Sequence, residues 1–214
     1  MRAADKVAIG ITLAVWLAVS VLAVREACAT VSEPTPDEIA AVVLEWAGHE
    51  CGYYCTDARR DGAPDRSADV VDEDDAHQLA IAIMAARVVY PEVPVSAFLA
   101  VAWHESSWQT YAVGPGGECG AWQQTPRYVR PEGLRESLAS YDDRCDHLQD
   151  LVGGALSFGD NAARWMAREG DDWLCFYHRG YDGCDADGRE YQREVGAEMR
   201  TIQHNLDAVR RAGS

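Results

Sequence analysis

Apolar residues recur along most of the chain at the spacing of α-helices, three or four positions apart. The first such segment begins at 35–38 (Thr-Pro-Asp-Glu), which offers an N-cap, a proline at the first helical position and a glutamate at the third. Segments 79–89 and 95–105 are strongly apolar and are predicted to form the core, and the helical pattern returns in 148–168 and 189–211. No strand pattern of comparable strength occurs, so we expect a mainly α-helical domain.

Polar and glycine-rich stretches separate these helices. Residues 56–75 are rich in Asp, Arg, Gly and Pro and are predicted to form an exposed loop, whose acidic end at 72–75 caps the helix that follows. Glycine and proline recur in 111–128, and a further loop carries Gly180 and Gly183. These stretches therefore mark the ends of the predicted helices.

The first thirty residues have the features of an export signal. Arg2 and Lys6 form a basic start, 7–24 carries no charge, and Ala-Cys-Ala at 27–29 supplies small residues for cleavage before Thr30. We expect an exported protein of the periplasm or cell envelope, with an uncleaved membrane anchor as the open alternative. The chain then divides into three parts: a signal peptide or anchor at 1–29, an N-terminal helix and acidic loop at 30–75, and a catalytic domain at 76–211.

Composition and charge exclude several functions. The 214 residues, 48% of them hydrophobic, suit one compact domain, which we expect to be monomeric. Lys and Arg number 19 against 35 Asp and Glu, for a net charge of −16, which argues against nucleic acid as a partner. Lys6 is the only lysine, so a lysine nucleophile or base has no candidate beyond the N-terminus.

The cysteines predict a disulfide framework. The chain has seven, and removal of Cys28 with the signal leaves six, an even number suited to an oxidising compartment. Their spacing favours three pairs: Cys119 with Cys145, Cys175 with Cys184, and Cys51 with Cys55. A zinc site made by His49, Cys51 and Cys55 is the alternative for the last pair, although its spacing matches no common zinc finger.

A glutamate lies at an unusual position. Segment 98–108 is apolar up to His104, and Glu105 then stands where the helix meets a glycine-rich loop. A carboxyl shielded from water favours its protonated form and is suited to general acid catalysis, although a surface glutamate at a helix end is the alternative. A zinc-protease motif would need a histidine where Trp108 stands, so no metal site is expected here.

Three sequence blocks carry a family resemblance. They are Ala-Trp-His-Glu-Ser-Ser-Trp at 102–108, Gly-Glu-Cys-Gly-Ala-Trp-Gln-Gln-Thr-Pro at 117–126, and Phe-Tyr-His-Arg-Gly at 176–180. In this order and spacing, over about residues 76–200, the chain resembles the catalytic domain of soluble lytic transglycosylases, relatives of goose-type lysozyme. The resemblance implies a lysozyme-like helical domain with a substrate cleft, peptidoglycan as substrate, and Glu105 as catalytic acid and base.

The same blocks supply candidate substrate contacts. Gly120 would let the backbone approach a sugar, Gln123 offers a donor and an acceptor, and Tyr177 is placed to hydrogen-bond the acid. Ordinary capping or packing is the alternative for Gln123 and Tyr177. Trp108 and Trp122 are the aromatic candidates for the cleft. The full set of expected contacts is Ser106, Trp108, Gly120, Trp122, Gln123, Tyr177 and His178.

The chain departs from the family pattern at several of these positions. His178 replaces the usual asparagine, Gly114 stands where a serine is common, and Ala-Trp at 121–122 replaces a more aliphatic pair. The glutamate of the first block is retained.

The resemblance implies a chemistry that needs no cofactor. Glu105 would protonate the glycosidic oxygen between N-acetylmuramic acid and N-acetylglucosamine and then activate the muramoyl 6-hydroxyl, giving a 1,6-anhydro product. Hydrolysis of the same bond by water is the first alternative, for which the sequence names no clear second carboxylate. The others are a non-catalytic peptidoglycan-binding envelope protein and a helical, membrane-anchored interaction protein.

Overall fold

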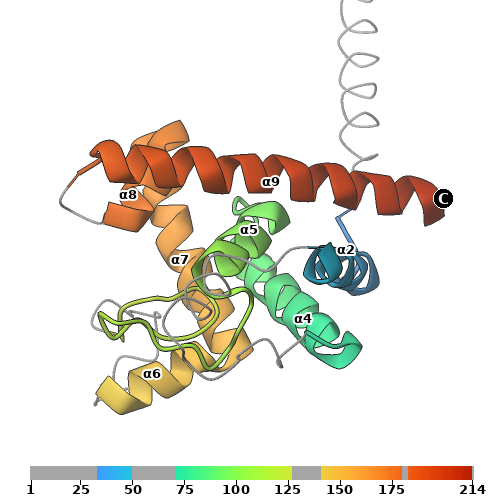
Figure 1. The fold of residues 1–214 in the computed structure, drawn as a ribbon, viewed down its shortest axis with the longest axis horizontal. Coiled ribbons are helices and arrows are strands. Elements are labelled where there is room, and N and C mark those ends of the chain that lie inside the picture. The colour runs from blue at the N-terminus through green and yellow to red at the C-terminus, as the bar shows by residue number, and fades with distance from the viewer. Residues whose placement is uncertain (1–32, 50–70, 127–140, 180–182, 214) are drawn as a thin grey trace, which may run out of the picture. The chain divides into compact units, whose positions relative to one another are not determined.

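Helices form the framework of the computed structural model, which describes residues 33–49, 71–126, 141–179 and 183–213 (Figure 1). In chain order they are α2 (Pro36–His49), α4 (Glu73–Val89), α5 (Val95–Ser106), α6 (Tyr141–Gln149), α7 (Leu151–Glu169), the 3-10 turn η3 (Gly170–Asp172), α8 (Trp173–Arg179) and α9 (Ala186–Gly213). Within the described ranges the only β-structure is two isolated bridges in the loop after α5. The predicted mainly α-helical fold is confirmed.

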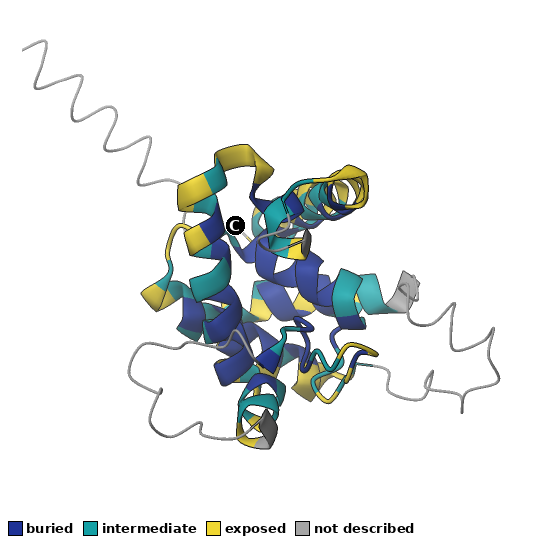
Figure 2. Cartoon of the chain, turned by 90° about the vertical axis from the view of Figure 1, so that its left-hand side faces the viewer, coloured by how far each residue is buried: buried dark blue, intermediate teal, exposed yellow. Residues whose placement is uncertain are grey.

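Helix α5 lies at the centre of the core. It is apolar on every face and is buried from Val95 to Trp103, as expected for a helix surrounded by others. Helices α4, α7 and α9 pack against it. Residues of α2, including Ile39 and Val43, belong to the same hydrophobic cluster, so the described helix of segment 30–75 packs into the core with the rest. Figure 2 shows the buried residues gathered where the helices meet.

The predicted helix starts are confirmed at two positions. At α2, the N–H of Thr35 donates to Glu38 Oε2 at 2.7 Å, and the N–H of Glu38 donates to Thr35 Oγ1 at 3.3 Å, which is a reciprocal capping box. At α4, the Asp72 side chain accepts from the N–H of Asp75 at 2.9 Å. The acidic run at 72–75 therefore caps α4, as the sequence predicted.

The helical pattern predicted over 148–168 is divided between two helices at Asp150. Leu148 belongs to α6, and α7 begins after Asp150, whose extended backbone and side chain cap it by accepting from the N–H of Gly153 at 2.8 Å. Helix α6 itself was not predicted, because it is polar and Leu148 is its buried apolar residue. Helix α8 was likewise not predicted as a helix, because only seven residues separate η3 from the next loop.

Two of the three predicted disulfides are confirmed. Cys119 is bonded to Cys145, joining the loop after α5 to α6, and Cys175 is bonded to Cys184, joining α8 to the segment just before α9. The third predicted pair, its zinc alternative and the uncharged run at 7–24 lie outside the described residues. None of the described helices is both long and apolar enough to cross a membrane.

Helix α9 connects distant parts of the fold. It runs along α5 and contacts both α8 and α2 (Figure 1). Its buried face includes Tyr191 near its start and Leu206 near its end, as expected for an amphipathic helix. Beside its end, Arg210 Nε lies 3.6 Å from Glu38 Oε2 of α2. At the other end, a hydrogen bond from Tyr191 to Glu105 places the start of α9 beside the end of α5.

Candidate active site

Glu105 occupies the last turn of α5, where the buried helix meets a loop. The two residues after the helix, Ser107 and Trp108, both have left-handed backbones, with φ of 54° and 64°. Such conformations cost free energy in residues other than glycine and tend to concentrate at functional sites. The N–H groups of Ser107 and Trp108 donate to carbonyls of α5 at 2.8 and 3.2 Å, which holds the turn.

The Glu105 carboxyl is half-buried and receives one strong hydrogen bond. Tyr191 Oη donates to Glu105 Oε1 at 2.6 Å. Burial raises the pKa of Glu105 from 4.5 to about 6, against the lowering effects of the Tyr191 hydrogen bond and of His104, while the charge of Glu118 adds to the rise. At neutral pH this multiplies the protonated fraction about thirtyfold over that of an ordinary glutamate. The carboxyl is thereby suited to donate a proton.

Tyr191 is held between two imidazole rings. His178 stacks on one side of it, with ring centroids 4.4 Å apart and an angle of 17° between the planes. His104 meets it edge-on, at 5.0 Å and 84°. Burial and the charge of Glu105 raise the pKa of Tyr191 well above 10, so its hydroxyl stays protonated and acts as a donor. His178 itself is exposed, and its expected contact with substrate stays a prediction.

The buried hydroxyl of Ser106 connects α5 to the loop that follows it. Its side chain is 1% exposed, and its hydroxyl lies 3.1 Å from the carbonyl of Ala102 and 2.7 Å from that of Ala121. The hydroxyl is enclosed and engaged by backbone, which gives it a structural role, and its expected contact with substrate stays a prediction. Its position fixes the loop of the second sequence block against the turn that carries Glu105.

Both tryptophans expected in the cleft belong to the core. Trp108 and Trp122 are 5% and 1% exposed. Their indole N–H groups donate to the carbonyls of Leu99 and Phe98 in α5, at 3.0 and 2.9 Å. Satisfied indole donors and apolar surroundings stabilise both rings inside the core, so a contact of either ring with substrate stays a prediction. Each instead holds a section of the loop against α5.

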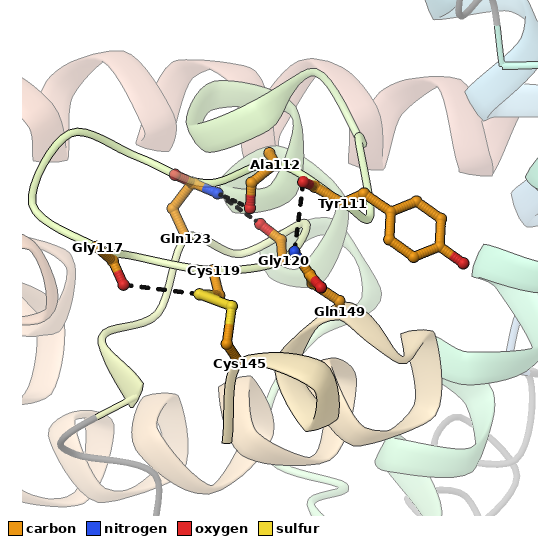
Figure 3. Close-up of a disulfide and its surroundings, with 8 residues drawn as sticks. All are labelled: Tyr111, Ala112, Gly117, Cys119, Gly120, Gln123, Cys145 and Gln149. Atoms are coloured by element: carbon orange, nitrogen blue, oxygen red, sulfur yellow. Dashed lines mark hydrogen bonds between the residues drawn. A yellow bond between two sulfur atoms is a disulfide. The ribbon is translucent and has the colours of Figure 1, made fainter. Parts of the chain in front are cut away.

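Gly120 and Gln123 shape the loop that the Cys119–Cys145 bond joins to α6 (Figure 3). Gly120 has φ of 80°, and a Cβ there would overlap the carbonyl oxygen of Leu148, so the close approach that it permits is to α6. Gln123 is buried, and its amide donates to the carbonyls of Ala112 and Gly120 at 3.2 and 2.8 Å (Figure 3). Both residues therefore have structural roles in the loop, and the expected approach of a sugar at Gly120 stays a prediction. A contact through Gln123 Oε1 stays a prediction.

Tyr177 lies beside Glu105 but does not hydrogen-bond it. Its hydroxyl donates to the carbonyl of Trp122 at 3.1 Å. Burial, and then the charge of Glu105, raise the pKa of Tyr177 well above 10, which indicates that the two side chains are neighbours. The expected bond to the acid is corrected: Tyr191 makes it instead.

Sequence reasoning did not single out Tyr191 as a functional residue. It was one of several apolar positions in the predicted helix 189–211, four residues before the buried Val195, and was interpreted as packing. Its hydroxyl needs a partner because it is buried, and that partner is 86 residues away. A tyrosine on an apolar stripe is a signal for a buried hydrogen bond, but spacing cannot name the acceptor.

The described residues offer no evident place for a metal ion. Among them, no group of three or more His, Cys, Asp and Glu side chains is arranged to bind one. The side chains gathered around the Glu105 carboxyl include the Tyr191 hydroxyl and, against the Tyr191 ring, the imidazoles of His104 and His178.

Comparison with known proteins identifies a family for this chain. The family model of the transglycosylase SLT domain matches residues 83–199, which are 117 of the 214 residues and include α5, the following loop and α8. Searches of curated proteins and of solved structures found no match. The matched segment contains Glu105 and Tyr191. The chain therefore belongs to the family of SLT-domain transglycosylases, enzymes that act on peptidoglycan.

Proposed function

We propose that the chain cleaves the β-1,4 bond between N-acetylmuramic acid and N-acetylglucosamine, with Glu105 as acid and then base. The observation that carries this is the Glu105 carboxyl itself: half-buried at the end of α5, bound by Tyr191, and with a pKa raised to about 6. Because Tyr191 occupies Oε1, we assign the proton transfers to Oε2.

The proposed reaction needs one carboxyl. The Glu105 proton passes to the glycosidic oxygen as the bond between that oxygen and the muramoyl C1 breaks, with assistance from the acetamido group of the substrate. The muramoyl O6 then bonds to C1, and its proton returns to the Glu105 carboxylate. The product carries a 1,6-anhydro ring, and the enzyme regains its starting protonation state without a cofactor.

Hydrolysis is the second candidate, because a second carboxylate is near. Glu118 is half-buried in the loop after α5, and its charge contributes to the raised pKa of Glu105. Its Oε2 accepts from the N–H of Gly116 at 3.0 Å. An inverting hydrolase uses such a carboxylate to activate water. The intramolecular reaction that we favour has no need of it.

Digestion of purified peptidoglycan, with mass spectrometry of the released fragments, tests the proposal. We expect anhydromuramoyl ends from the wild-type enzyme and from Glu118→Gln alike. Reducing ends that disappear in Glu118→Gln would establish hydrolysis instead. If the wild-type enzyme binds several types of peptidoglycan and cleaves none, the chain is a binding protein.

The N-terminal segment fits the same function. Peptidoglycan lies in the cell envelope, and the basic start, the uncharged run at 7–24 and the small residues at 27–29 would take the chain there. We assign 1–29 as a signal peptide, with a membrane anchor as the alternative. Either places the catalytic domain on the same side of the membrane as its substrate.

A further inference from the structure

His104 is enclosed by acidic groups on the side of α5 that faces α9. Its Nδ1 lies 3.5 Å from Glu198 Oε1, and its Nε2 lies 4.0 Å from Glu194 Oε2. A neutral imidazole would turn a lone pair toward one of these carboxylates, whereas an imidazolium directs an N–H to each. The geometry thus favours a positive charge at this position, adjacent to Glu105.

The charges around His104 support the same protonation state. Burial lowers the pKa of His104, but the hydrogen bond and charge of Glu198, together with the charges of Glu105 and Glu194, outweigh it and leave the pKa raised. Tyr191 of α9 is the remaining titratable group against the ring. Glu198 Oε2 is buried without a hydrogen-bond partner. The contact of Glu198 Oε1 with His104 therefore offsets part of the free-energy cost of burying this carboxylate.

His104 is connected to the Glu105 carboxyl through Tyr191. The ring packs edge-on against Tyr191, whose hydroxyl bonds Glu105. Tyr191, Glu194 and Glu198 follow one another along α9 at intervals of three and four residues, so they share one face of that helix. A contact between His104 and the two glutamates therefore fixes the rotation of α9, and with it the place of the Tyr191 hydroxyl.

We propose that His104, as an imidazolium held by Glu194 and Glu198, is a positioning residue that keeps the Tyr191 hydroxyl on Glu105. This rests on the proposed function of Glu105, because the positioned group is the catalytic acid. His104 touches no reacting atom in this account. It acts through Tyr191, and its influence should depend on that hydroxyl.

The test combines His104→Gln and Glu198→Gln with Tyr191→Phe. Glu190→Gln is the matched control, since Glu190 is an exposed glutamate of the same helix that pairs with Arg193. We expect His104→Gln and Glu198→Gln each to lower kcat at least fivefold with little change in KM, and Glu190→Gln to leave both unchanged. In the Tyr191→Phe background the same two changes should cost less than twofold.

The contrary results are distinct. Equal fold losses in both backgrounds would show that His104 does not act through Tyr191, and unchanged kcat in both single variants would show that it positions nothing. If His104→Gln does not fold, the kcat of Glu198→Gln, measured with Tyr191 and with Tyr191→Phe, tests the proposal by itself.

A second measurement separates this proposal from the proposed function. If the wild-type enzyme cleaves no peptidoglycan, carbon-13 NMR titration of the Glu105 carboxyl replaces the assay. We then expect His104→Gln to raise the pKa of Glu105, and to raise it less when Tyr191→Phe is also present. An unchanged pKa, or an equal rise in both backgrounds, would overturn the role of His104.

Discussion

The Tyr191 hydroxyl donates a 2.6 Å hydrogen bond to Glu105 Oε1 across 86 residues of sequence. The bond joins the start of α9 to the end of α5, and both residues lie within the segment that matches the family model. It favours the ionised carboxylate, while burial favours the protonated acid. The balance leaves the pKa of Glu105 at about 6, between the ordinary value and that of a fully shielded acid.

Tyr191→Phe should raise the pKa of Glu105, because it removes the hydrogen bond that stabilises the carboxylate. A general acid loses activity as the pH rises through its pKa, so the alkaline limb of the pH–rate profile should move to higher pH. We expect kcat to fall about tenfold, in line with the loss of one positioned hydrogen bond to a charged group. The profile of kcat against pH checks this.

Tyr111→Phe is the control for that change, since Tyr111 is exposed on the loop after α5. Its profile should match the wild-type profile. A Tyr191→Phe profile that moves to lower pH, or does not move, would contradict the assigned hydrogen bond.

The raised pKa of Glu105 also predicts a pH-dependent stability. A group whose pKa is raised by folding contributes fully below its unfolded value, here 4.5, and loses that contribution as the pH rises through about 6. The ionised carboxylate should therefore cost about 2 kcal/mol at pH 7. Glu105→Gln removes this cost and should melt a few degrees higher than the wild type at pH 7 but not at pH 4. Equal melting temperatures at both pH values would show that the carboxyl is not desolvated.

The two confirmed disulfides should differ in how much each contributes to the stability of the fold and to activity. The Cys119–Cys145 bond spans 26 residues and the Cys175–Cys184 bond spans 9. Loop-closure entropy gives about 3.5 and 2.6 kcal/mol for these spans. Replacing the first pair by serine should therefore lower the melting temperature more than replacing the second. It should also lower activity more, since the loop that it holds contacts Ser106 beside Glu105.

Thermal melting and peptidoglycan release from the two double variants check this. A larger activity loss on removing Cys175–Cys184 would contradict the role given to the loop of the second sequence block.

The helix pattern of the chain was largely predictable, because amphipathic spacing and local caps are properties of short segments. The capping box at Thr35 and the acidic cap at Asp72 needed only neighbouring residues. Helix α6 was not predictable in this way, since its apolar contact is a single leucine and a disulfide holds it in place. The break at Asp150 depends on one side-chain cap within a continuing apolar pattern.

The sequence singled out Glu105 but not the side chains that surround it in the structure. Glu105 could be named because a carboxyl at the end of an apolar helix is locally unusual. Trp122 was expected in the cleft because an aromatic beside a glycine suits a sugar ring, but its indole N–H finds a carbonyl of α5 and the ring is buried. Tyr191 was interpreted as packing, because only the folded chain brings its hydroxyl to the acid.

The N-terminus gives a separate prediction. If 1–29 is a signal peptide, N-terminal sequencing of the exported protein should begin at Thr30. Recovery of the full-length chain from the membrane fraction would instead establish an anchor at 7–24. Neither result changes the assignment of Glu105.

The initial rate of peptidoglycan release by Glu105→Gln, compared with that of the wild type, tests the central claim most directly. The variant keeps an oxygen to accept the Tyr191 hydrogen bond and should fold and bind peptidoglycan normally, but it carries no transferable proton. We expect its rate to fall by about a hundredfold to ten-thousandfold, with further loss from the missing base. Equal rates for a folded Glu105→Gln and the wild type would contradict the account.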